Sequence, residues 1–193
     1  LDTITATPHR FNLEEAVFGY RNSIFKTALK GKHVITAVQF RLTKKNHILK
    51  TDYGVIQEEL GSKVSSPKNI AEAVIAIRQR KLPDPKKIGN SGSFFKNPII
   101  STERFEELQK EFPNIVGYKM ADTETKVAAG WLIDNAGLKG YRKGDAGVHK
   151  NQALVLVNYN NASGQDIINL SELVQEVILE KYGISIEAEV NFI

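Results

Sequence analysis

The chain has 193 residues, of which 41% are hydrophobic and 25% charged, and its net charge is +4. This composition is typical of a soluble protein with one or two domains and a proper core, and the lack of cysteine excludes disulfides and thiolate metal sites. No run approaches the roughly 20 apolar residues of a membrane span, and the first residues lack a signal-peptide pattern. We therefore expect a cytoplasmic protein with no membrane partner.

The amino-terminal part of the chain predicts one short helix and one strand. Asn12 and Glu15, three positions apart, resemble a helix-capping pair and indicate a helix over 13–18. Apolar residues alternate with others over 33–42, as they do in a half-buried strand. We expect this strand to pack in the first domain.

A second helix is predicted from its capping residues. Ser66 followed by Pro67 is typical of an N-cap and a first helical position, and an apolar stripe runs on to about Arg80. The sequence Leu82-Pro83-Asp84-Pro85 must end this helix, because two prolines forbid its continuation and stiffen the connection. We therefore place a domain boundary between residues 82 and 83.

From Lys86 onward, helices and strands mix in an α+β order. One helix is expected to start at Ser101-Thr102 and to stop before Pro113. Another is expected over 126–136, closed by Gly137 in the C-terminal glycine position.

The end of the chain carries the clearest patterns. The apolar run 153–157 predicts a central strand, and 165–182 predicts an amphipathic helix ended by Gly183. From Ile184 the tail alternates strictly between apolar and polar residues, so that the two kinds point in opposite directions.

The segment 89–98, Gly-Asn-Ser-Gly-Ser-Phe-Phe-Lys-Asn-Pro, is the most informative part of the chain. Its glycines permit backbone conformations closed to other residues. The adjacent Phe94 and Phe95 can be buried and so anchor a loop, which leaves the hydroxyl of Ser93 facing outward. The same residues could instead form a simple turn that enters a strand.

Four further blocks accompany this segment along the chain. They are Phe18-Gly19-Tyr20-Arg21-Asn22-Ser23-Ile24-Phe25-Lys26, Lys81-Leu82-Pro83-Asp84-Pro85-Lys86, Ala128-Ala129-Gly130-Trp131-Leu132-Ile133 and His149-Lys150-Asn151-Gln152-Ala153-Leu154-Val155-Leu156-Val157-Asn158. From about residue 10 to the end, the chain resembles the UDP-N-acetylenolpyruvoylglucosamine reductase family, flavoenzymes of bacterial peptidoglycan synthesis. Several separated motifs in one order are far more specific than any single short pattern.

The resemblance implies an α+β fold in three parts: the end of a flavin-binding domain over 1–82, a two-layer substrate-binding domain over 83–184, and a terminal strand over 185–193 that returns to the active site. It implies FAD and NADPH as cofactors. The implied reaction reduces UDP-N-acetylglucosamine enolpyruvate to UDP-N-acetylmuramate in cell wall biosynthesis. The family's amino-terminal flavin-binding region would precede Leu1, so we expect this chain alone to hold flavin poorly and to be inactive.

The resemblance also implies three catalytic residues on distant parts of the chain. Ser93 matches the serine that protonates the carbon intermediate, and Arg21 and Glu189 match the catalytic arginine and glutamate. An arginine fork can bind the substrate's carboxylate, toward which charge moves as hydride arrives. Glu189 would then be either protonated or a support for Arg21. Taken singly, each residue would rather be a turn former or a solvated surface charge.

Other positions match the family's binding residues. Lys81 and Asn97 are expected to hold the diphosphate, as a point charge and an amide donor, and Tyr53 is expected on a substrate-covering loop. Weaker matches for contacts to the substrate or the nicotinamide nucleotide are Tyr118, Lys126, Gln152 and Arg78, and Tyr20 is expected to border the flavin. For the weaker matches, solvent exposure or structural hydrogen bonding is an equal alternative.

Other chemistries have little support in the sequence. The four histidines show no zinc-ligand spacing, so no metal is expected. Basic pairs such as Lys44-Lys45 are scattered and not interleaved with aromatic residues, which argues against a nucleic-acid partner. The alternative to an enzyme is a non-catalytic module that keeps a UDP-sugar pocket without redox function or binds a nucleic acid through its positive charge. We expect a monomer that acts on a small-molecule substrate.

Overall fold

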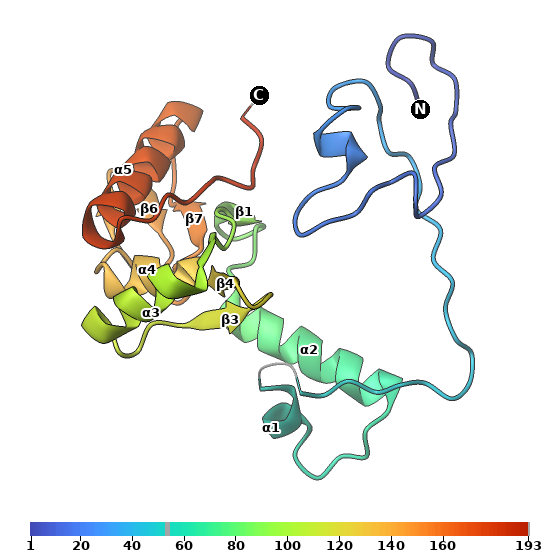
Figure 1. Ribbon diagram of the computed structural model, residues 1–193, viewed down its shortest axis with the longest axis horizontal. Coiled ribbons are helices and arrows are strands. Elements are labelled where there is room, and N and C mark those ends of the chain that lie inside the picture. Colours follow the sequence, from blue (N-terminus) through green and yellow to red (C-terminus); the bar gives the residue numbers. More distant parts are fainter. Residues whose placement is uncertain (53–54, 193) are drawn as a thin grey trace. The chain divides into compact units, whose positions relative to one another are not determined.

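The computed structural model describes residues 1–52 and 55–192, which form two units, Leu1–Ile48 and Leu49–Ile193. The first unit consists mainly of turns, with one short 3-10 helix, η1, over Ile24–Lys26 (Figure 1). The second unit holds the regular helices and strands. No helix in the described parts of the chain is long and apolar enough to cross a membrane.

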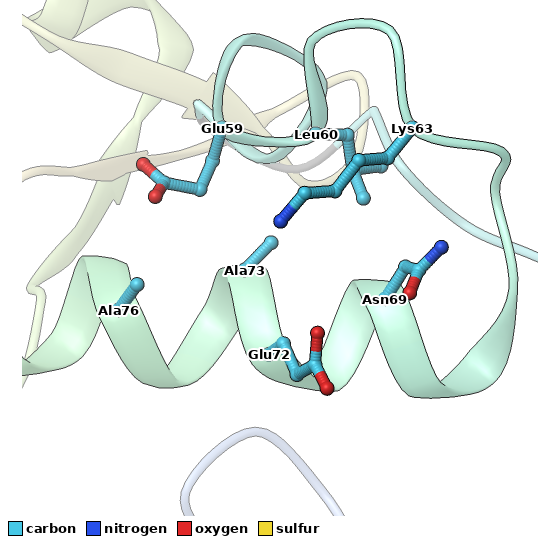
Figure 2. Close-up of a pocket in the computed structure, with 7 residues that line it drawn as sticks. All are labelled: Glu59, Leu60, Lys63, Asn69, Glu72, Ala73 and Ala76. Atoms are coloured by element: carbon cyan, nitrogen blue, oxygen red, sulfur yellow. The ribbon is translucent and has the colours of Figure 1, made fainter.

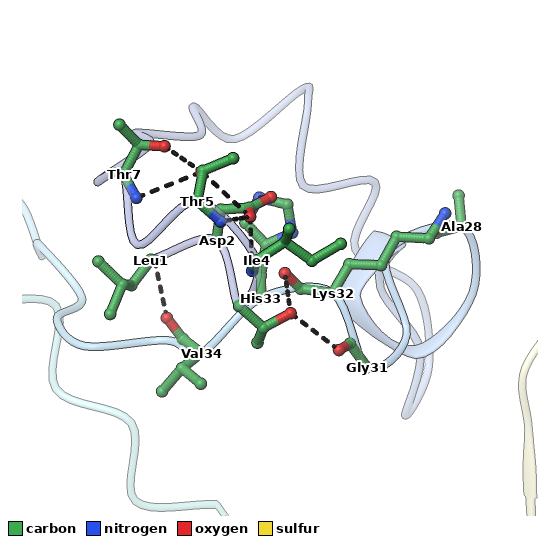
Figure 3. A network of polar contacts seen from close by, with 11 residues as sticks. Leu1, Asp2, Ile4, Thr5, Thr7, Ala28, Gly31, Lys32, His33 and Val34 are labelled. Atoms are coloured by element: carbon green, nitrogen blue, oxygen red, sulfur yellow. Dashed lines mark hydrogen bonds and ion pairs between the residues drawn. The ribbon is translucent and has the colours of Figure 1, made fainter.

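Hydrogen bonds tie the amino terminus of the first unit to residues 31–34, as Figure 3 shows. The terminal ammonium of Leu1 donates to the carbonyl of Val34 over 2.9 Å. The carboxylate of Asp2 accepts from the backbone N–H groups of Ile4 and Thr5, both over 2.8 Å, and these bonds lower the pKa of Asp2. Short polar side chains thus shape this turn.

Both elements predicted in the first unit are wrong. Asn12 and Glu15 do form the predicted reciprocal capping bonds, of 2.8 and 2.9 Å, but only turns follow over 13–17. A helix this short is not stable without packing against another element. Among the described residues, the segment 33–42 pairs only at its start, with Leu1 and Asp2, and Val38 and Leu42 are 66% and 80% exposed. A strand needs a neighbour for its backbone groups, and the described residues supply none beyond that point.

Two helices, α1 over Ile56–Leu60 and α2 over Pro67–Lys81, open the second unit. Ile56 and Leu60 of α1 are buried against Ala73 of α2. Helix α2 is as the sequence predicts, because the Ser66 hydroxyl accepts from the N–H of Asn69 over 3.1 Å and Pro67 is its first residue.

The rest of the second unit contains two antiparallel sheets. The four-stranded sheet has the order β1-β7-β6-β5, with β1 at Gly89–Ser93, β7 at Val155–Asn158, β6 at Ala146–Val148 and β5 at Arg142–Lys143. The three-stranded sheet has the order β2-β4-β3, with β2 at Ile99–Ser101, β4 at Glu124–Val127 and β3 at Gly117–Lys119. The expected α+β class is therefore confirmed.

Three helices pack against these sheets around one hydrophobic core. They are α3 at Thr102–Glu111, α4 at Ala129–Asn135 and α5 at Gly164–Tyr182 (Figure 1). The longest, α5, begins with a capping box between Ser163 and Asp166 and ends at Gly183, whose φ of 64° is left-handed. Its Val174 and Ile178 are fully buried.

The sequence predictions for this part are correct for most elements. Helix α3 starts after its N-cap Ser101 and stops before Pro113, and the run 153–157 is found as β7, which has a partner strand on each side. The helix predicted over 126–136 is wrong at its start, because 124–127 form strand β4 and α4 begins only at Ala129. Pairing with β2 and β3 on both sides outweighs the helical pattern there. The domain boundary at 82–83 remains a prediction.

Candidate active site

A β-bulge sets the direction of Ser93 at the end of β1. Asn90 pairs with Val157, whereas Ser93 pairs with Val155, so β1 contains one residue more than β7 between these pairs. The segment 89–93 is therefore an irregular strand rather than the predicted loop. The side chain of Ser93 is exposed.

The two phenylalanines that follow Ser93 anchor this segment in the core. Phe94 and Phe95 are 3% and 1% exposed, and their ring centroids lie 5.2 Å apart. The N–H of Phe94 donates to the carbonyl of Leu154 over 2.7 Å. A serine next to such an anchor has a fixed position although its own side chain is exposed.

The carboxy-terminal tail runs beside the same segment. The N–H of Glu189 donates to the carbonyl of Phe94 over 2.7 Å, and the N–H of Lys96 donates to the carbonyl of Glu187 over 2.9 Å. The tail is seated from its other side by buried Ile186, whose carbonyl accepts from Gln175 Nε2 of α5 over 2.7 Å. Glu189 is thus hydrogen-bonded, through its backbone, to the residue next to Ser93.

An ion pair adds a side-chain link between these segments. Lys96 Nζ lies 2.7 Å from Glu187 Oε2, and this contact lowers the pKa of the Glu187 carboxyl. Neither Lys96 nor Glu187 has a role predicted from the sequence. The alternation of the tail predicts that Glu187 lies on the polar side of the tail. Its partner Lys96 could not be predicted, because the two residues are 91 positions apart in the sequence.

Asn97 and Gln152 both lie at the first residues of α4. Asn97 Oδ1 accepts from the N–H of Ala129 over 2.9 Å. A β-carbon placed on Gly130 would lie 4.0 Å from Gln152 Oε1. Because Oδ1 is engaged with Ala129, the Asn97 Nδ2 atom is the end of this amide that can donate to a ligand.

Tyr118 and Lys126 lie opposite each other on neighbouring strands. They are paired across β3 and β4, and Lys126 Nζ lies 5.4 Å from the centroid of the Tyr118 ring. Tyr118 is 53% exposed. Ammonium and ring form a cation–π contact on the exposed face of the smaller sheet.

Arg78 and Lys81 lie in the last turn of α2, where positive charges interact favourably with the helix dipole. The chain then turns through Pro83, whose carbonyl accepts from Asn90 Nδ2 of β1 over 3.4 Å. The connection that follows Lys81 is thereby fixed to the strand that ends in Ser93.

Tyr20 and Arg21 lie at the tip of a tight turn in the first unit. Gly19 and Asn22 close this turn with two backbone hydrogen bonds, of 3.0 and 3.2 Å. Arg21 has a φ of 53°, which is uncommon for a residue other than glycine. Ala6, Val17 and Asn46 of the same unit also have a positive φ, so this conformation does not by itself distinguish Arg21. Tyr53 lies outside the described residues.

The cavity between α1 and α2 does not suit a flavin. A cavity of about 200 Å³ lies between α1 and α2 (Figure 2) and is lined by Glu59, Leu60, Lys63, Asn69, Glu72, Ala73 and Ala76. Neither Tyr20 nor Arg78 lines it, and its charged lining of both signs does not suit an apolar isoalloxazine ring.

Comparison with known proteins agrees with these motifs. The family model described as the C-terminal domain of UDP-N-acetylenolpyruvoylglucosamine reductase matches residues 84–193. A reductase of that name from Flavobacterium johnsoniae is 58% identical over 95% of this chain and 55% of its own length. The one from Pseudomonas syringae pv. tomato is 45% identical over 99% of this chain and 57% of its own. The chain thus spans about half the length of the curated relatives that it matches.

A solved structure of the reductase from Thermus caldophilus is 27% identical to this chain and covers 64% of it and 33% of its own length. Its TM-score of 0.40 is too low for the two folds to be compared. The family model alone covers more than half of the chain. The chain therefore belongs to the UDP-N-acetylenolpyruvoylglucosamine reductase family, of which it contains the C-terminal domain.

Proposed function

We propose that this chain provides the substrate-binding and proton-donating part of a reductase that converts UDP-N-acetylglucosamine enolpyruvate to UDP-N-acetylmuramate. The family's flavin, FAD reduced by NADPH, would supply the hydride, and the chain's own residues bind the substrate and deliver the proton. The protein acts as a cytoplasmic monomer on a small molecule.

The observation that carries this proposal is the pairing of the tail with residues 94–96. It brings Glu189 and Ser93, which are 96 positions apart, onto adjacent backbone segments. Glu189 is held by its backbone hydrogen bond to Phe94, and Ser93 precedes this buried residue in the chain, so neither is held by a surface loop alone. Rigid support of this kind is what precise proton delivery requires.

The reduction adds a hydride to one carbon of the enol ether and a proton to the other. The Ser93 hydroxyl donates the proton, and its oxygen regains one from solvent after the product has left. Serine is a weak acid in water, but the accepting enolate carbon is strongly basic. A positioned proton donor contributes about 10²- to 10⁴-fold in rate.

The charged residues act on the substrate's carboxylate. Arg21 binds this carboxylate bidentately and stabilises the charge that moves toward it during hydride addition. A charged Glu189 would repel that carboxylate unless it also held a cation. Glu189 is therefore either protonated in the complex or holds Arg21 in position.

The remaining residues bind the nucleotide part of the substrate. Lys81 and the Nδ2 group of Asn97 hold the diphosphate, and Gln152 contacts the substrate at the start of α4. The Tyr118 ring and the Lys126 ammonium offer a flat surface and a charge that suit a uracil ring and a phosphate. Tyr53, Tyr20 and Arg78 keep the roles that the sequence resemblance implies for them.

The test is a chimera in which this chain replaces the matching part of the Flavobacterium johnsoniae reductase, assayed by substrate-dependent NADPH oxidation. We expect turnover in the chimera and a 10²- to 10⁴-fold lower kcat in its Ser93→Ala variant. The matched control is Ser91→Ala, which removes a hydroxyl from the same strand. A Ser93→Ala chimera as fast as the control would refute the role of Ser93.

Two measurements on the chain alone test its part in this reaction. Calorimetry should detect binding of UDP-N-acetylglucosamine to the chain, and the Lys126→Ala variant should bind this ligand less tightly. Binding to a single-stranded oligonucleotide alone, weakened by salt, would refute the proposal in favour of a nucleic-acid module. A stoichiometric yellow flavin complex of the purified chain would contradict the expectation that it holds flavin poorly.

A further inference from the structure

We propose that Asn90 is a positioning residue for the reaction: its side chain holds the bulge that turns Ser93 outward and ties the connection after Lys81 to the same strand. This inference rests on the proposed function, because it concerns the geometry of the proton donor and of one diphosphate ligand. It assigns a role to a side chain that touches neither substrate nor cofactor.

The bulge decides which face of the sheet Ser93 occupies. Gly89 pairs with Asn158 and Asn90 with Val157, and the same register continued would place Ser93 opposite Leu154. Ser93 would then share a face with Leu156, which belongs to the hydrophobic core. With one extra residue it pairs with Val155, on the other face. A shift of one residue exchanges the faces of all side chains that follow.

The burial of Phe94 depends on the same extra residue. Next to Ser93 in the chain, Phe94 points to the opposite side of the strand and lies in the core. A strand without the bulge would exchange the faces of Ser93 and Phe94, and Phe94 would leave its place in the core cluster that contains Leu156. The bulge therefore provides both the anchor and the exposed hydroxyl.

Both ends of the Asn90 amide are used to hold the bulge. Its Oδ1 accepts from the N–H of Gly92 over 3.0 Å, and Gly92 has a φ of 75°, which favours glycine. Its Nδ2 donates to the carbonyl of Ile88 over 2.9 Å and to that of Pro83 over 3.4 Å. Since one end accepts and the other donates, a residue with only one of these functions can keep only half of the contacts.

The contact with Pro83 extends this role to the diphosphate ligand. Pro83 follows Lys81 by two positions and lies in the connection that leaves α2. One side chain therefore links the expected proton donor to the expected phosphate ligand. Loss of the Oδ1 contact should affect Ser93, whereas loss of the Nδ2 contacts should affect the position of Lys81.

Amide hydrogen exchange in this chain, measured by NMR, tests the two halves separately. In Asn90→Ala, we expect exchange at Gly92 and Phe94 to become at least tenfold faster than in the wild type. In Asn90→Asp, which keeps the acceptor and loses the donor, Gly92 and Phe94 should stay protected. The amides of Lys87 and Ile88, which donate to Asp84, should exchange faster in both variants.

The control is Ser91→Ala on the same strand, and buried amides of α5 report on global stability. Unchanged exchange at Gly92 and Phe94 in Asn90→Ala would overturn the proposal, as would equal acceleration of all amides, including those of α5. If Asn90→Ala does not fold, Asn90→Asp decides: unchanged exchange at Lys87 and Ile88 would overturn the link to Lys81.

Kinetics of the chimera separate positioning from mere support of the fold. Asn90→Ala should lower kcat at least tenfold and raise KM for the enolpyruvyl substrate, whereas Asn90→Asp should raise KM and keep kcat within about threefold of the wild type. A purely structural role would lower the active fraction, and hence kcat, in both variants with KM unchanged. A chimera without turnover would refute the proposed function, and the exchange results would still decide on the bulge.

Discussion

The tail that carries Glu189 is held mainly by its buried apolar residues, and two substitutions at adjacent positions test this. Ile186 is buried in the core, so Ile186→Ala should cost about 2–5 kcal/mol. The ion pair of Glu187 with Lys96 is exposed, with 74% of the Glu187 side chain and 32% of the Lys96 side chain accessible. Exposed pairs contribute only about 0.2–1 kcal/mol, so Glu187→Gln should have a much smaller effect.

Hydrogen exchange at the Glu189 amide, which donates to the Phe94 carbonyl, is the appropriate assay. We expect Ile186→Ala to accelerate it by a factor of at least about 30, and Glu187→Gln by no more than about 5, because about 1.4 kcal/mol corresponds to a factor of ten. The pKa of Glu187 is lowered by Lys96, so the contribution of this pair is present above the ordinary value of 4.5 and is lost as the pH falls through the lower folded pKa. Exchange at the Glu189 amide should therefore become equal in the wild type and the Glu187→Gln variant in acid, where the ion pair is lost. A Glu187→Gln variant that loosens the tail as much as Ile186→Ala would refute this reasoning.

Three further substitutions have definite expected outcomes. Gly92→Ala should cost about 1–2 kcal/mol in urea unfolding, because a β-carbon there meets no atom within 4 Å and only the φ of 75° opposes it; the control Gly164→Ala, at a glycine without a positive φ, should be neutral or stabilising. Ser66→Ala should lower stability by about 1 kcal/mol through loss of the N-cap of α2, and equal stability of the two proteins would contradict that role. Burial raises the pKa of Tyr182 to about 12, so its contribution to the free energy of unfolding should be fully present below pH 10. The free energy of unfolding should then fall by up to about 1.4 kcal/mol per pH unit as the pH rises toward 12. Tyr182→Phe should remove this loss in pH-dependent thermal unfolding, and an unchanged profile would show that another group causes it.

Elements with their own start and stop signals could be predicted from the sequence. Helix α5 has a capping serine and a terminal glycine, and α2 has Ser66 and Pro67, so local interactions are sufficient to define their ends. These capping signals require no knowledge of distant partners. The alternation of the tail is confirmed only over 184–187, where Ile184 and Ile186 are buried while Ser185 and Glu187 are exposed. The predicted terminal strand is wrong, because among the described residues the tail pairs only through an isolated bridge between Phe95 and Ala188, and Phe192 is 54% exposed.

Elements that depend on distant partners could not be predicted in this way. The segment 124–127 has residues that also suit a helix, and it is a strand because β2 and β3 flank it. The bulge at 90–93 is visible only in the register with β7, although an asparagine two residues before a glycine is typical of a local side-chain turn. The proximity of Ser93 to Glu189 follows from the same kind of long-range pairing. Family resemblance suggested their shared role, but no local pattern could place them side by side.

The candidate catalytic residues differ in what holds them, and this difference has a physical origin. Ser93 and Glu189 lie beside Phe94, and Phe94 belongs to a core with many fully buried side chains. In residues 1–48, by contrast, Ala16 is the only buried hydrophobic residue, and apolar side chains such as Phe40 are exposed. Hydrogen bonds, including those that close the Gly19–Asn22 turn around Arg21, shape that unit without a core. Because exposed hydrogen bonds contribute little net stability, Arg21 is the member of the proposed site whose position depends least on packing within its own unit.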